Sequence, residues 1–176
     1  MAEIIVRERQ AADREGLLTA LTACARATGY FADPEGELVA HAEESVFDER
    51  FDAAWVAELE GRIVGHVALM PLTLSEDIDC IPIWAEATGY PAEKHTLVKR
   101  LFVDPGAQRG GIAKALMAVA MERIEQRDQL GVLDTASIAE PAMTLYHRLG
   151  WREIARTKPH WTDDPFDMVL FVGPGL

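Results

Sequence analysis

The sequence predicts a single α/β (α+β) domain in which helices cover the faces of one sheet. Three observations support this fold class. The chain has 176 residues, a length that suits one domain with a sizeable core. Its apolar residues switch between strand and helix spacing in the order strand, helix, helix, and then strands and helices mixed. No internal repeat, low-complexity run or linker interrupts that order, so we expect one domain over residues 1–176.

The N-terminal half is predicted to contain three strands and two helices. Leu17, Leu18 and Leu21 recur at helical spacing within residues 14–28. Residues 33–52 hold eight carboxylates against one arginine, and their apolar residues fit one face of a second, acidic helix. A hairpin turn is expected at residues 60–62, because Gly61 tolerates the positive φ of such turns. The strands expected in this half cover residues 4–7, 53–58 and 63–72.

The C-terminal half begins with a 20-residue connection over residues 76–95, which fits a lid or substrate wall as well as a plain surface insertion. A strand over residues 96–103 then ends at the turn Asp104-Pro105-Gly106. The following helix shows apolar residues on one face from Ile112 to Ile124 and ends before Gly131. The remaining predictions are a helix over residues 141–149 and strands over residues 132–137, 151–157 and 167–172.

Charge and composition exclude several function classes. The net charge of −12 argues against a nucleic-acid partner, since that affinity comes mainly from cations that pair with phosphates. No apolar stretch approaches the roughly 18 residues of a membrane helix, and the N-terminus does not resemble a signal peptide. Cys24 and Cys80 have no metal-type spacing. We therefore expect a cytoplasmic protein that binds no metal and has neither nucleic acid nor membrane as a partner.

One segment has the opposite charge. Residues 94–114 carry five lysines and arginines against Asp104 alone, a local net charge of +4. Within it, small residues at Gln108-Arg109-Gly110-Gly111-Ile112-Ala113-Lys114 let backbone N–H groups approach a ligand at the positive end of a helix dipole. The sequence lacks the Lys and Ser or Thr of a P-loop and has no G-x-G-x-x-G. A phosphate-bearing ligand other than a nucleoside triphosphate is the expected guest.

The pattern Gln108-x-x-Gly111-x-Ala113, directly after Leu101-Phe102-Val103-Asp104-Pro105, resembles the acetyl-coenzyme A signature of the GNAT family of N-acetyltransferases. Leu145-Tyr146, followed by Leu149-Gly150-Trp151, is similar to a later element of the same family. The resemblance implies a GNAT-like central mixed, mostly antiparallel sheet of six to seven strands. It also implies about four flanking helices and strands that splay at the cofactor site.

The resemblance further implies how acetyl-coenzyme A, as co-substrate, would be held. Backbone groups of the strand would line the pantetheine arm and the acetyl carbonyl, and backbone amides of the glycine turn would wrap the pyrophosphate. In the family a bulge in this strand leaves backbone groups unpaired for the ligand. The implied cofactor-binding residues are Leu101, Phe102, Val103, Gln108, Arg109, Gly110, Gly111, Ile112, Ala113 and Lys114.

The implied chemistry is direct attack of a neutral amine on the thioester. The backbone N–H of Phe102 or Val103 would stabilise the oxyanion, and Tyr146 would donate a proton to the leaving thiolate. Tyr146 as a core aromatic residue is the alternative. Ala139 and Leu97 stand where the family often has an asparagine and a carboxylate base, so the base is unassigned. The candidates for a proton relay are His95, Glu58, His66, Glu43 and Glu44.

The sequence thus predicts an enzyme, an acyl-CoA-dependent N-acetyltransferase that acts on a small-molecule or peptide amine. The acidic residues at 33–52 favour a cationic acceptor. The acceptor itself stays open, because acceptor loops share no motif, and assembly as a homodimer stays open as well. A non-catalytic acetyl-coenzyme A sensor and an interaction protein with an acidic surface are the rival functions.

Overall fold

A computed structural model describes residues 3–28 and 37–175, without the side chains of residues 37–40, 108 and 109. The first part of the predicted acidic helix, at residues 33–36, therefore lies outside the described residues. The strands are β1 (Ile4–Glu8), β2 (Ala53–Leu59), β3 (Arg62–Pro71), β4 (His95–Val103), β5 (Leu130–Ala136), β6 (Arg152–Thr157) and β7 (Met168–Val172). The α-helices are α1 (Arg14–Thr28), α2 (Glu37–Val46), α3 (Ile81–Thr88), α4 (Ile112–Gln126) and α5 (Glu140–Arg148).

The described chain divides into two compact units. The first unit contains residues up to Leu69 together with Lys99–Glu122, and the second contains Met70–Val98 and the residues from Arg123 onward. Strand β4 contributes its second half to the first unit and its first half to the second. The prediction of a single domain over residues 1–176 stays a prediction.

The hydrogen-bonded strand order is β1-β2-β3-β4-β5-β7-β6. Antiparallel pairing joins β1 to β2, β2 to β3, β5 to β7 and β6 to β7, whereas β4 and β5 are parallel over His95–Leu97 and Leu130–Val132. The expected mixed, mostly antiparallel sheet is therefore confirmed with seven strands. The described residues form five α-helices where about four were expected.

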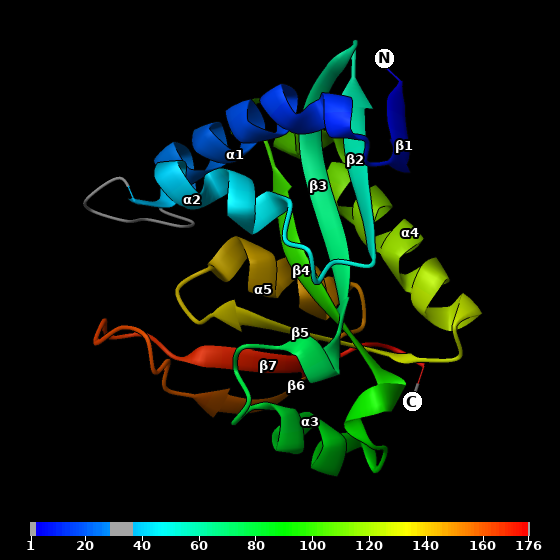
Figure 1. The fold of residues 1–176 in the computed structure, drawn as a ribbon, viewed down its shortest axis with the longest axis vertical. Helices are drawn as coiled ribbons and strands as arrows, with labels where there is room; N and C mark the ends of the chain where they lie inside the picture. The colour runs from blue at the N-terminus through cyan, green and yellow to red at the C-terminus, as the bar shows by residue number, and fades with distance from the viewer. Residues whose placement is uncertain (1–2, 29–36, 176) are drawn as a thin grey trace. The chain divides into compact units, whose positions relative to one another are not determined.

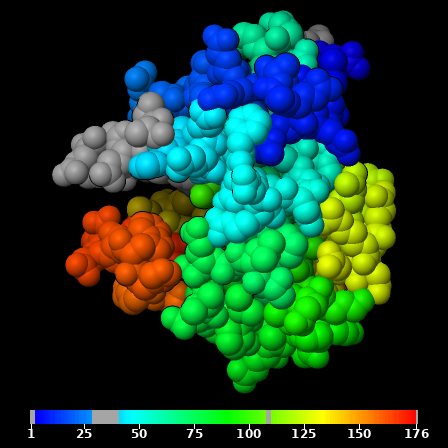
Figure 2. All heavy atoms as spheres, in the orientation of Figure 1, coloured from blue at the N-terminus to red at the C-terminus, as the bar shows by residue number. Residues whose placement is uncertain are grey.

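Helices α1 and α2 lie side by side in the first unit (Figure 1), and Figure 2 shows both at its surface in blue and cyan. Their apolar faces share a core with β2 and β4, which explains the helical spacing of the apolar residues in the sequence. This core consists of the buried residues Leu17, Ala20, Leu21, Cys24, Ala42, Val46, Val56 and Phe102. Cys24 is thus the small core residue that the sequence predicts.

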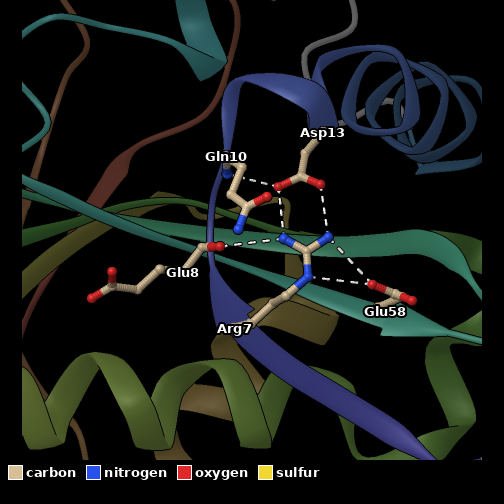
Figure 3. Close-up of polar contacts among 5 residues, drawn as sticks. All are labelled: Arg7, Glu8, Gln10, Asp13 and Glu58. Carbon is tan, nitrogen blue, oxygen red and sulfur yellow. Dashed lines mark hydrogen bonds and ion pairs between the residues drawn. The ribbon is translucent and has the colours of Figure 1, made fainter.

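An ion-pair network fixes the entry into α1 (Figure 3). The Arg7 guanidinium donates to both oxygens of Asp13 at 2.8 and 2.9 Å and to Glu58 at 3.2 Å. The backbone N–H of Gln10 donates to Asp13 at 2.7 Å. These contacts tie the turn before α1 to β1 and β2, and the Arg7 hydrogen bonds hold the pKa of Asp13 below its ordinary value.

The connection predicted at residues 76–95 contains a helix, α3, that the sequence analysis did not identify. This eight-residue helix has a proline in its first turn and is followed by Gly89, which has a left-handed φ of 74°. Trp84 is fully buried and donates its indole N–H to the carbonyl of Phe171 at 3.1 Å. In the second unit α3 is therefore anchored to β7.

No α-helix in the described part of the chain is long and apolar enough to cross a bilayer.

Candidate functional site

Strand β4 changes conformation in its middle. Arg100 has a φ of +53°, in the left-handed region that residues with a Cβ avoid at a cost of about 1 kcal/mol. The other non-glycine residues of the described chain with positive φ, Glu60 and Asp128, lie in turns. The burial pattern of β4 also breaks here, with half-buried residues from Lys99 to Leu101 between buried ones. A left-handed residue inside a strand is typical of a bulge, a feature that locally disrupts the hydrogen-bond ladder and bends the strand.

A buried histidine holds the irregular residue. His66 on β3 is fully buried, and its Nδ1 lies 2.9 Å from the carbonyl oxygen of Arg100. Its ring stacks on Phe102 at a centroid distance of 5.4 Å. Burial, together with the nearby guanidinium groups of Arg9 and Arg100, lowers the pKa of His66 to about 3. The imidazole is therefore neutral under physiological conditions.

Arg9 and Arg100 also contact the C-terminal end of α2. The Arg9 guanidinium lies 3.2 Å from His66 Nε2, donates to the carbonyl of Val46, and stacks over the ring of Phe47 at 4.4 Å. Arg100 Nε donates to the carbonyl of Ser45 at 3.1 Å. The last turn of a helix leaves carbonyls without intrahelical partners, and two arginines satisfy two of them here.

Helix α4 approaches the same part of β3 closely because Gly65 has no side chain. A Cβ on Gly65 would lie 3.0 Å from Leu116, 3.2 Å from Ile112 and 3.2 Å from the carbonyl oxygen of Phe102. Ile112 and Leu116 are both buried. The start of α4 is therefore fixed against the strand that borders the irregular part of β4.

A capped turn connects β4 to α4. The backbone N–H of Asp104 donates to the carbonyl of Val64 at 2.7 Å, which keeps the end of β4 beside β3. The Asp104 carboxylate accepts from the N–H of Gly106 at 2.8 Å and caps the 3₁₀ turn Pro105–Gly110. This arrangement confirms the turn that the Asp-Pro-Gly sequence predicts.

The turn ends at Gly111, whose φ of 74° is left-handed. A Cβ on Gly111 would meet no heavy atom of the described chain within 4 Å. Helix α4 begins at the next residue, so the N–H groups of its first turn have no intrahelical acceptor and carry the positive end of the helix dipole. The expected phosphate-binding residues Gly110, Gly111, Ile112, Ala113 and Lys114 thus all lie at this helix start, together with the backbone of Gln108 and Arg109.

The cations of the +4 segment differ in their surroundings. Lys114 is exposed on the first turn of α4. The Arg100 guanidinium donates to the carbonyl of Ser45 in α2, and Lys99 is half-buried on β4. Lys94, in the second unit, donates to the carboxylate of Asp128 at 2.5 Å. Lys114 is therefore better placed than Lys94 to meet a phosphate.

Tyr146, the expected proton donor, lies on α5 in the second unit and is 7% exposed. Its ring contacts those of Trp151 and Phe171 at centroid distances of 6.2 and 5.6 Å. The residues expected to bind the cofactor, from Leu101 to Lys114, belong to the first unit. The role of Tyr146 as proton donor therefore stays a prediction.

The five candidates for a proton relay have other partners. His95 is buried, with Nδ1 2.9 Å from the carbonyl of Pro91 and Nε2 2.8 Å from the Thr88 hydroxyl. Both nitrogens of His66 are engaged as described above. The three glutamates each contact a cationic or basic side chain, which pairs Glu58 with Arg7, Glu43 with Arg14 and Glu44 with His41. We therefore assign none of them as the base.

The two positions at which the sequence departs from the family pattern are structurally ordinary. Leu97 is fully buried on β4, opposite Val132 of β5. Ala139 precedes α5, and its carbonyl accepts from the N–H of Met143 at 3.1 Å. Within the described residues, no three His, Cys, Asp or Glu side chains gather as a metal site would require.

Arg9 and the role of Arg100 are not among the features predicted from the sequence. An arginine directly after a strand, and an arginine within one, give no local sign that both will bind helix carbonyls. Histidine at residue 66, inside an apolar strand, was a detectable sign, because a buried imidazole needs two hydrogen-bond partners. The sequence offers His66 as a candidate for a proton relay, with a structural role as the more common one for a lone histidine, and does not show which groups it contacts.

Comparisons with known proteins agree with this geometry. Residues 2–151 match the family described as "Acetyltransferase (GNAT) family". A human protein named N-acetyltransferase 8 is 31% identical over 118 residues, which are 65% of this chain. The chain spans 44% of the length of that protein.

Solved structures share the fold over almost the whole chain. An N-acetyltransferase from Staphylococcus aureus Mu50 superposes with a TM-score of 0.68 and 14% identity, covering 97% of both chains. The yncA protein of Salmonella typhimurium, solved with its cofactor acetyl-CoA, superposes with a TM-score of 0.65 and 13% identity, covering 97% of this chain and 92% of its own. Because residues 2–151 match the family model, this chain belongs to the acetyltransferase (GNAT) family.

Proposed function

We propose that this chain is an acyl-CoA-dependent N-acetyltransferase that transfers the acetyl group of acetyl-CoA to a primary amine. The observation that carries the proposal is the segment from β4 to α4, in which the left-handed Arg100 precedes a glycine turn at a helix start. Membership of the acetyltransferase (GNAT) family supports it. So does the yncA structure, which shares the fold and contains acetyl-CoA.

The residues at the glycine turn fit the pyrophosphate of acetyl-CoA. Backbone N–H groups from Arg109 to Lys114 would donate to its oxygens at the positive end of the α4 dipole. Gly111 leaves room for a close approach, since a Cβ there would contact nothing in the described chain. The exposed Lys114 adds a cation. The backbone of Leu101–Val103, which follows the irregular residue of β4, would hold the pantetheine arm.

The proposed reaction proceeds in a ternary complex, in which acetyl-CoA supplies an activated thioester. The amine nitrogen forms the new bond to the acetyl carbon as the bond from that carbon to sulfur breaks. The backbone N–H of Phe102 or Val103 stabilises the carbonyl oxygen, and the Tyr146 hydroxyl gives a proton to the coenzyme A sulfur. The amine releases its proton to water, since Leu97 offers no base.

A cationic acceptor is the proposed substrate class. The chain has a net charge of −12, and two glutamates of α2 lie at the surface, with the Glu43 side chain 45% exposed and the Glu44 side chain 80% exposed. A polyamine or a basic peptide would be attracted to such a surface, and this attraction would weaken with added salt.

The experiment is a free-thiol assay with acetyl-CoA and a panel of polyamines, aminoglycosides, amino acids, peptide N-termini and lysine peptides. The proposal predicts coenzyme A release with at least one amine and a product heavier by one acetyl group. Faster release with cationic than with neutral amines supports the acceptor class. Absence of release across the whole panel would contradict transfer to these amines.

The full burial of Leu97, at a position where several members of the family carry a carboxylate as base, favours a second candidate function. In this alternative the chain binds acetyl-CoA as a sensor without turnover. Tight acetyl-CoA binding together with no thiol release to any amine would favour the sensor over the enzyme.

A further inference from the structure

His66 links the side chain of Arg9 to the carbonyl group of Arg100. His66 comes from β3, Arg9 follows directly after β1, and Arg100 itself lies on β4. His66 is fully buried, and its two ring nitrogens lie 2.9 Å from the Arg100 carbonyl oxygen and 3.2 Å from Arg9 Nη1. All three residues belong to the first unit.

The partners determine the protonation state of the imidazole. A carbonyl oxygen only accepts, so Nδ1 of His66 must carry the proton that it donates to Arg100. A guanidinium only donates, so Nε2 must present its lone pair to Arg9. A second proton would place a buried N–H against another N–H. His66 is thus a fixed, neutral donor and not a proton shuttle.

The hydrogen bond falls on the one left-handed residue inside a strand of the described chain. Arg100 has a φ of +53° and is not a glycine, so its conformation persists only where surrounding contacts hold it. The His66 ring also stacks on Phe102, two residues further on, with 23° between the ring planes. One side chain therefore contacts β4 at the irregular residue and just after it.

The same cluster continues to the end of α2. Arg9 donates to the carbonyl of Val46, and Arg100 donates to that of Ser45. The irregular residue is thus held through its own carbonyl by His66 and through its own side chain by α2. Loss of His66 would remove the side-chain hydrogen bond to this carbonyl while the contact with α2 persists.

We propose that His66 is a positioning residue for acetyl-CoA binding, which clamps the Arg100 carbonyl and thereby orients the backbone of Leu101–Val103. The inference rests on the proposed function, in which that backbone holds the pantetheine arm. His66 touches neither substrate nor reacting atoms in this role. It holds the carbonyl of a strand residue with an irregular φ through a side-chain hydrogen bond.

The experiment measures the Kd of acetyl-CoA by calorimetry for wild type and three variants. His66→Phe keeps the ring against Phe102 and removes both hydrogen bonds. His66→Asn keeps a donor near the position of Nδ1. His95→Phe is the matched control, because His95 is also buried with both nitrogens engaged.

We expect His66→Phe to raise the Kd about tenfold or more, His66→Asn to restore it to within about threefold of wild type, and His95→Phe to leave it unchanged. Equal affinity in wild type and folded His66→Phe would overturn the positioning role, as would an equal loss in His95→Phe. Should His66→Phe not fold, His66→Asn and His66→Gln give the same comparison, since the Gln amide lies near Nε2 and would not rescue.

A double-mutant cycle tests the physical reason. Arg100→Gly keeps the carbonyl and makes the left-handed φ free of strain. The effect of His66→Phe on the Kd should therefore be smaller in the Arg100→Gly background than in wild type, and an undiminished effect would overturn the proposal. If wild type binds no acetyl-CoA, the proposed function fails with it, whereas normal wild-type binding with an indifferent His66→Phe refutes the positioning role alone.

Discussion

The buried neutral histidine makes stability depend on pH. Burial lowers the pKa of His66 to about 3 in the folded chain, whereas an unfolded histidine titrates near its ordinary value of about 6.5. Between these two values the unfolded chain binds a proton that the folded chain does not. Stability contributed by the neutral imidazole is therefore complete above about pH 6.5 and decreases as the pH falls.

The size of the effect follows from the two pKa values. Protonation of the histidine stabilises the unfolded chain by about 2 kcal/mol at pH 5 and by about 0.2 kcal/mol at pH 7. Wild type should thus lose about 2 kcal/mol of unfolding free energy from His66 alone on going from pH 7 to pH 5. Carboxylates with lowered pKa, such as Asp13, reduce the unfolding free energy only below about pH 4, which lies outside the range from pH 7 to pH 5.

The assay is urea unfolding of wild type and His66→Gln at several values between pH 7 and pH 5. The other histidines, including the buried His95, are common to both chains, so the difference between the curves isolates residue 66. Between pH 7 and pH 5, we expect the unfolding free energy of wild type to decrease by about 2 kcal/mol more than that of the variant. Parallel curves would refute the account, as would a ring titration by NMR that places the pKa of His66 near 6.5.

Three further predictions concern single residues. Tyr146→Phe should lower turnover about 100-fold or more with an unchanged acetyl-CoA Kd, and equal thiol release would remove Tyr146 from the mechanism. Gly65→Ala should lower the unfolding free energy in urea by about 1–3 kcal/mol, because its Cβ would lie 3.0 Å from Leu116, and an unchanged midpoint would contradict this packing. Asp13→Asn should cost about 2 kcal/mol at pH 7, and the difference from wild type should shrink below about pH 4, because the Arg7 contact keeps the pKa of Asp13 low. A difference independent of pH would contradict the last prediction.

Elements with a strong local pattern could be predicted from the sequence. Helix α1 was expected over residues 14–28 and is found at Arg14–Thr28, since its apolar spacing reflects one buried face. Helix α3 was missed because its eight residues span about two turns, too few to show a period. The proline in its first turn and Gly89 at its end were the available signs.

The site was predictable in part for the same reason. A glycine at residue 111 is typical of a left-handed φ, and the φ of Gly111 is 74° in the structure. Arg100 has a similar φ of 53° without being a glycine, so no local pattern could predict it. The side chain that contacts its carbonyl is that of His66, which lies 34 residues away in the sequence. Contacts of that range are decided by tertiary packing.

The central claim is that acetyl-CoA binds where the glycine turn enters α4. Acetyl-CoA titration of wild type, Gly111→Ala and Gly89→Ala tests it most directly. Both glycines have a φ of 74°, and a Cβ on either would meet no heavy atom within 4 Å in the described chain, so the two substitutions impose the same backbone strain. Only the Cβ at residue 111 would obstruct a pyrophosphate. We predict that Gly111→Ala binds acetyl-CoA at least about tenfold more weakly than wild type and that Gly89→Ala binds like wild type, whereas equal affinity in all three would contradict the claim.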